Sequence, residues 1–71
     1  MTQGTVTKIV SSYGARWGNV RPDQEPRQLF FNGDSLADGL DFITLVLGDR
    51  VEFSQEPDRA NGLRATGMRR I

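Results

Sequence analysis

The stretch RWGNVRP, residues 16–22, holds the only tryptophan of this 71-residue chain, between two arginines. In a β-strand, successive side chains point to opposite faces. Gly18 and Val20 then share one face, whereas Trp17, Asn19 and Arg21 share the other. This pattern predicts that Trp17 points outward beside an amide and a cation. The alternative is that Trp17 is a core anchor, because a shift of one residue in the strand inverts every face.

Short segments rich in β-forming residues recur along the whole chain, separated by glycines, prolines and polar turns. The predicted strands are residues 5–10, 16–20, 27–32, 50–55 and 63–71. Residues 34–49 have room for one helical turn, but their glycines disfavour a long helix. Five short strands with turn signals between them indicate a single all-β domain over residues 1–71, a barrel or a sandwich.

The alternation also predicts the core. Val51 and Phe53 share a face, and so do Leu29 and Phe31, which leaves Phe30 and Asn32 on the outward side. Between Val6 and Ile9 the alternation slips by one residue, which indicates a β-bulge or a sharp bend.

The composition removes several kinds of chemistry. The chain has no cysteine and no histidine, which excludes disulfides and thiolate metal sites, counts against a zinc site and removes the usual general base. No apolar run is long enough to span a membrane, and the first ten residues lack the apolar stretch of a signal peptide. We therefore expect a cytoplasmic protein without metal or cofactor.

Nine cations balance nine carboxylates, so the formal net charge is zero. This counts against strong non-specific binding to polyanions, which grows with the number of phosphates neutralised. The acids Asp34, Asp38, Asp41, Asp49, Glu56 and Asp58 fall in predicted connections, whereas Arg16, Arg21, Arg27 and Arg64 fall in or beside predicted strands. A local basic face is therefore expected despite the neutral total.

Trp17 and Phe30 would lie exposed on neighbouring strands. Exposed aromatic rings can stack on unpaired bases, each stack contributing about 1–3 kcal/mol whatever the base. Flanking arginines would contact phosphates or stack themselves.

Several landmarks, in this order, resemble the cold-shock domain, a five-stranded oligonucleotide-binding (OB-fold) barrel with a long loop between its third and fourth strands. Gly4-Thr5-Val6 resembles the family's opening Gly-x-Val. RWGNVRP resembles its first RNP motif, and LFFN (29–32) resembles its second. GLDFITLVLGDRVEF (39–53) is similar to its long loop and fourth strand, and NGLRATG (61–67) is similar to its last loop and strand. The resemblance implies single-stranded nucleic-acid binding, of the RNA chaperone or antiterminator type, with Trp17, Phe30 and Phe42 as the base-stacking surface.

The chain also departs from that family. Lys8 stands in place of the first-strand tryptophan, Asn19 in place of the second aromatic of the first motif, and Asn32-Gly33 in place of a histidine and an aromatic. The loss of several stacks would weaken binding by orders of magnitude, so a weak or specialised binder is expected. Tyr13 either replaces a lost aromatic or is a turn residue with a free hydroxyl.

For RNA or DNA as partner, the expected phosphate contacts are Lys8, Arg16, Arg21 and Arg64, and Asn19 and Asn32 are expected to bond base edges. A protein-interaction module that uses the Trp17–Phe30 patch is the alternative.

The C-terminal part, from Gly48 to Arg69, is also similar to bacterial translation initiation factor one, a ribosome binder. An enzyme would need an acid–base pair such as Asp34/Asp38 or Asp38/Asp41. Loop carboxylates are commonly just solvated, so we expect no enzymatic activity.

Overall fold

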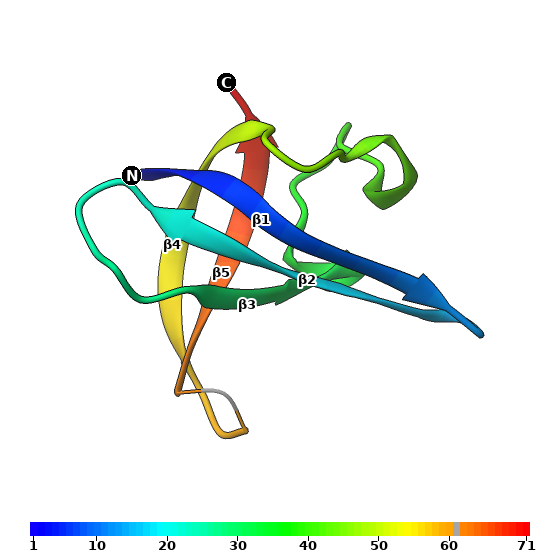
Figure 1. Ribbon diagram of the computed structural model, residues 1–71, viewed down its shortest axis with the longest axis horizontal. Helices are drawn as coiled ribbons and strands as arrows, with labels where there is room; N and C mark the ends of the chain where they lie inside the picture. The colour runs from blue at the N-terminus through cyan, green and yellow to red at the C-terminus, as the bar shows by residue number, and fades with distance from the viewer. Residues whose placement is uncertain (61) are drawn as a thin grey trace.

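The computed structural model describes residues 1–60 and 62–71, so Asn61 of the NGLRATG stretch lies outside the described residues. Its strands are β1 (Thr2–Ser12), β2 (Ala15–Pro22), β3 (Leu29–Asn32), β4 (Arg50–Asp58) and β5 (Gly62–Arg70). They form a closed barrel in the order β1-β2-β3-β5-β4 (Figure 1). The all-β prediction is thus confirmed, and the closed five-stranded barrel is consistent with the expected OB fold.

Strands β1 and β2 form a long antiparallel hairpin that extends away from the rest of the barrel (Figure 1). Its turn is Tyr13-Gly14, where both residues have positive φ, 49° and 84°. The register of the pair shifts between Val6 and Lys8, which confirms the predicted bulge. Beyond this bulge Lys8 and Val10 point to the same face as Trp17, and Ile9 packs against the core.

The barrel closes where β3 meets β5 in parallel, with Phe30 opposite Arg64 as the one registered pair among the described residues. Just beyond β3, a second parallel bridge joins Leu36 to Met68. The Ala37 N–H donates a 2.8 Å hydrogen bond to the Met68 carbonyl and supports this contact. Closure therefore depends on few backbone contacts at the end of β3.

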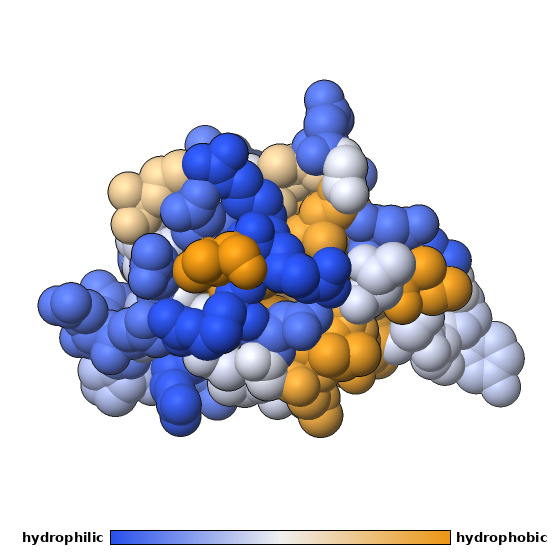
Figure 2. All heavy atoms as spheres, turned by 90° about the horizontal axis from the view of Figure 1, so that it is seen from above, coloured by the Kyte–Doolittle hydropathy of each residue, from blue (hydrophilic) through white to orange (hydrophobic). Residues whose placement is uncertain are grey.

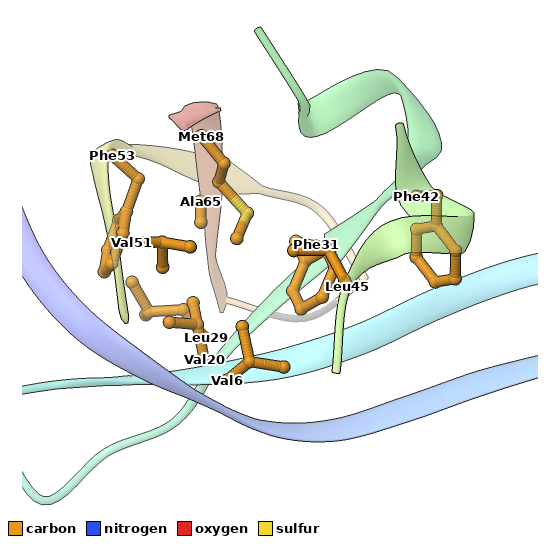
Figure 3. Close-up of a cluster of buried hydrophobic side chains, with 10 residues drawn as sticks. All are labelled: Val6, Val20, Leu29, Phe31, Phe42, Leu45, Val51, Phe53, Ala65 and Met68. Atoms are coloured by element: carbon orange, nitrogen blue, oxygen red, sulfur yellow. The ribbon is translucent and has the colours of Figure 1, made fainter. Parts of the chain in front are cut away.

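Among the described residues, ten buried apolar side chains from every strand and from the 33–49 connection form the core (Figure 3). Leu29, Phe31, Val51 and Phe53 are each fully buried, which confirms the inward side that alternation predicted. Val20 is buried as well, whereas Trp17 is half-buried. The interpretation of Trp17 as a core anchor is wrong, because the interior beneath β2 is occupied by the side chains of the opposite parity.

The connection between β3 and β4 contains two short 3₁₀ turns, Gly33–Ser35 and Phe42–Thr44, where one helical turn was expected. Asn32 caps the first turn: its Oδ1 accepts a 3.0 Å hydrogen bond from the Asp34 N–H. Asp41 caps the second turn through a 3.2 Å bond from the Ile43 N–H. Each polar cap satisfies a backbone N–H that a helix start leaves unpaired. No helix in the described part of the chain is long and apolar enough to cross a membrane.

Gly18 is required by packing. A Cβ there would collide with the Lys8 carbonyl oxygen and would lie 2.8 Å from the Phe31 ring. The absence of a side chain at this position therefore lets β1 approach β2 while Phe31 fills the core below.

We expect Gly18→Ala to lower the free energy of unfolding by about 1–3 kcal/mol, because the backbone of β1 or the ring of Phe31 must move. Urea denaturation of the variant and the wild type measures the difference. Gly33→Ala is the matched control, since a Cβ at Gly33 meets nothing within 4 Å. Equal stability of the two variants would contradict this account of Gly18.

A second prediction concerns Asp49, just before β4. Its Oδ2 accepts 2.9 Å bonds from the Val46 N–H and from Arg70. The Val46 bond, and then the Arg70 bond, hold the pKa of this carboxyl below its usual range. The carboxylate thus stabilises the fold above the ordinary aspartate pKa, and this contribution is lost as the pH falls through the lowered pKa.

We expect the wild type to lose stability between about pH 5 and pH 2, and Asp49→Asn to lose less over the same range. Denaturant unfolding at a series of pH values measures both. Asp38→Asn, at an exposed carboxylate with no hydrogen bond among the described residues, should keep the wild-type dependence. The same slope in Asp49→Asn and the wild type would show that Asp49 contributes nothing to acid sensitivity.

Candidate nucleic-acid interface

Strand register gathers most of the predicted binding residues on one outward face. Lys8 lies opposite Asn19, Asn19 opposite Phe30, and Phe30 opposite Arg64, so one row crosses four strands. In the next row, Trp17 lies opposite Asn32. We call this surface, which comprises Lys8, Trp17, Asn19, Phe30 and Asn32, the aromatic face.

Trp17 and Phe30 are diagonal neighbours on this face and stack on each other. Their ring centroids are 6.1 Å apart and the ring planes differ by 25°. Both side chains are half-buried, and together with Arg16 and Asn32 they line a shallow hollow. The prediction that both rings point outward is confirmed.

Lys8 also contacts the indole. Its Nζ lies 5.0 Å from the centroid of the Trp17 ring, within the distance of a cation–π interaction. Lys8 and Trp17 are diagonal across the β1–β2 pair, so register alone brings the ammonium over the ring. This contact was not anticipated from the sequence.

The guanidinium of Arg64 is hydrogen-bonded at the edge of the aromatic face. Its Nη2 donates hydrogen bonds to Asn32 Oδ1 (3.1 Å) and to Ser35 Oγ (3.0 Å). Ser35 is fully buried, and its Oγ also accepts a 3.0 Å bond from the Asn32 N–H, completing a capping box. Arg64 therefore holds the end of β3, and its contact with phosphate stays a prediction.

Sequence reasoning missed this structural role, although the signal was partly present. The spacing Asn32-x-x-Ser35 is compatible with a capping box, but nothing local indicated the partner on β5. The Arg64 Nε is buried and makes no hydrogen bond within the described residues. The Asn32 Oδ1 is shared among Asp34, Ser35 and Arg64, and the contact of Asn32 with a base edge stays a prediction.

Phe42 does not join the aromatic face, and this prediction is wrong. The side chain is only 5% exposed, and its ring centroid lies 5.9 Å from that of Phe31. The turn capped by Asp41 directs the ring into the core, so it offers no open face to a base. It lines a second shallow hollow beside Arg16, Leu36 and Leu40.

Tyr13 lies at the tip of the β1–β2 hairpin and is fully exposed. Its position in the turn favours the interpretation as a turn residue, because within the described chain it has no ring contact with Trp17 or Phe30. It therefore does not restore a lost aromatic to the face.

Some of the charged side chains form ion pairs across the surface. Ion pairs join Arg50 to Asp23, Arg69 to Glu52 and Arg70 to Asp49. The hydrogen bond from Arg50 also lowers the pKa of Asp23. Lys8, Arg16 and Arg21 form no ion pair within residues 1–60 and 62–71, although Arg21 lies close enough to Asp23 to lower the pKa of that carboxyl. The local basic face expected from the sequence stays a prediction.

Other parts of the surface are less distinctive. No group of three or more carboxylates, cysteines or histidines in the described chain could hold a metal ion. Exposed apolar side chains occur elsewhere, including Ile43, Val46 and Leu47. Figure 2 shows the apolar side chains of one side of the molecule as separate patches among hydrophilic residues.

Comparison with known proteins adds no assignment: no family model matches the chain, and no curated protein shows significant similarity to it. The interpretation of the site therefore depends on its geometry.

We expect Arg64→Ala to lower the free energy of unfolding by about 1–3 kcal/mol, because Ser35 Oγ loses a buried partner. Arg64→Met, which keeps the apolar stem, should recover the packing part of this loss. Arg59→Ala, at an exposed arginine near the β4–β5 turn, is the charge-matched control and should change stability by less than about 0.5 kcal/mol. Urea denaturation distinguishes these cases, and an Arg64→Ala variant as stable as Arg59→Ala would contradict the role in closure.

Proposed function

We propose that this barrel binds single-stranded nucleic acid, RNA in particular, by stacking bases on Trp17 and Phe30. The observation that carries the proposal is the stacked Trp17–Phe30 pair on the outward face of β2 and β3. OB-fold barrels bind oligonucleotides on the face of their second and third strands. The activity would be that of an RNA chaperone or antiterminator, without chemistry of its own.

The polar surroundings of the pair support the same ligand. Lys8, Arg16 and Arg21 form no ion pair within the described residues and are suited to contact phosphates, although Arg21 lies near Asp23 and Arg16 near Asp41. The Asn32 Nδ2 and the half-buried Asn19 amide are suited to bond base edges. The ordered likeness of RWGNVRP and LFFN to cold-shock motifs supports membership in that family and a place in the cytoplasm.

The size of the aromatic face predicts weak binding. One or two bases can stack on two rings, which contributes about 1–6 kcal/mol in total. Three phosphate contacts on a single strand give a slope of about −2 for log K against log[salt]. Dissociation constants in the micromolar range or weaker are therefore expected.

Binding is tested by titrating the protein at low salt with thymidine and uridine heptanucleotides while following Trp17 fluorescence. We expect quenching that saturates, because a base stacked on the indole changes its surroundings. The absence of any quenching at high micromolar oligonucleotide would contradict the proposal. Capture of a protein partner that survives nuclease treatment, with no oligonucleotide binding, would favour the protein-interaction alternative.

Trp17→Ala and Phe30→Ala should each weaken binding about 5- to 150-fold, the equivalent of one lost stack. Fluorescence anisotropy of an end-labelled heptanucleotide measures this without requiring the tryptophan. Leu47→Ala, which removes an exposed apolar side chain outside the aromatic face, should bind as the wild type does. An equal loss of affinity in all three variants would show that non-specific hydrophobic contact, rather than base stacking, drives the binding.

A further inference from the structure

The aromatic face is already occupied by a group of the protein itself. The Lys8 ammonium lies over the Trp17 ring at 5.0 Å from its centroid. Phe30 stacks on the same indole at 6.1 Å. Because β1 and β3 flank β2 on opposite sides, these two contacts approach Trp17 from opposite strands.

A base that stacks on Trp17 needs a ring face, and Lys8 and Phe30 both lie against this ring. Phe30 is held by its pairing with Asn19 and Arg64, so its backbone cannot retreat without opening β3. Lys8 is exposed, and its ammonium forms no ion pair within the described residues. The flexible stem of the lysine is therefore the group that can leave.

We propose that Lys8 covers, in the free protein, the Trp17 face that a base occupies in the complex. Binding then moves the ammonium from the ring to a phosphate of the incoming strand. This inference rests on the proposed function and adds to it a built-in competitor. A cation–π contact at an exposed site opposes binding about two- to fivefold, less than one base stack favours it.

The two roles of Lys8 respond differently to salt and to the charge of the ligand. Salt screens the phosphate contact, whereas competition for the ring does not need a ligand charge. The affinity for an oligomer with an uncharged backbone therefore depends only on the competition between Lys8 and a base for the Trp17 ring. A phosphodiester oligomer detects both effects.

The test compares wild type, Lys8→Thr and Arg59→Ala with a thymidine heptamer and its uncharged methylphosphonate analogue. Threonine suits a strand and is too short to cover the indole. We expect Lys8→Thr to bind the analogue about two- to fivefold more tightly than the wild type. With the phosphodiester, its slope of log K against log[salt] should be smaller in magnitude by about 0.7, so that the two lines cross as salt rises.

The control Arg59→Ala removes the same charge away from the ring and should leave affinity for the analogue unchanged. In the absence of ligand, acrylamide should quench Trp17 more efficiently in Lys8→Thr than in the wild type or in Arg59→Ala. Thermal unfolding of each variant establishes that it is folded.

The inference is overturned if Lys8→Thr leaves ligand-free quenching unchanged. It is also overturned if the phosphodiester lines do not cross, or if the variant binds the analogue no better than the wild type. A wild type that binds neither oligomer would instead overturn the proposed function, and this inference with it.

Discussion

The contact between Phe30 on β3 and Arg64 on β5 closes the barrel and at the same time fixes the aromatic face. From the same position, Arg64 bonds Asn32 and Ser35, which hold the end of β3 and the turn that follows it. The ring of Phe30 can stack on Trp17 only if β3 keeps this place. The stability of the barrel and the geometry of the proposed binding surface therefore both depend on the guanidinium of Arg64. Arg64 is half-buried, and its buried Nε, which has no hydrogen-bond partner within the described residues, costs free energy that the bonds to Asn32 and Ser35 partly offset.

Alternation along short strands was sufficient to predict which residues face the core. Val20, Leu29 and Phe31 lie inside because a strand that curves around a barrel buries one parity and exposes the other. Trp17 and Phe30 then face outward even though they are among the largest apolar side chains. The bulge after Val6 was also predictable, because a regular β1 strand would place Val6 and Ile9 on opposite faces of the sheet. Strand ends were less accurate: β4 runs through Asp58, because its pairing with β5 continues beyond the last alternating residue.

Contacts between distant segments were not predictable in this way. Phe42 belongs to a connection without regular alternation, so only its packing against Phe31 reveals that it is buried. The bonds from Arg64 join positions 29 and 32 residues apart, and the lysine over Trp17 depends on a register set by the bulge. Resemblance to a family placed Phe42 on the surface, whereas the geometry of its capped turn places it in the core. Local pattern thus determined the two faces of the sheet, and tertiary packing determined which groups complete the site.

A neutral total charge does not exclude a local basic face, because only some of the cations form ion pairs within the described residues. Arg50, Arg69 and Arg70 pair with Asp23, Glu52 and Asp49, whereas Lys8, Arg16 and Arg21 on the hairpin form no ion pair within the described residues. So few free cations attract a polyanion only weakly at physiological salt, where charges farther apart than about 8 Å are screened. In the proposed complex most of the affinity would then come from ring stacking, which is short-range and depends little on salt. A protein of this kind would discriminate unpaired from paired bases rather than nucleic acid from other polyanions, because only unpaired bases present a free π-face to Trp17.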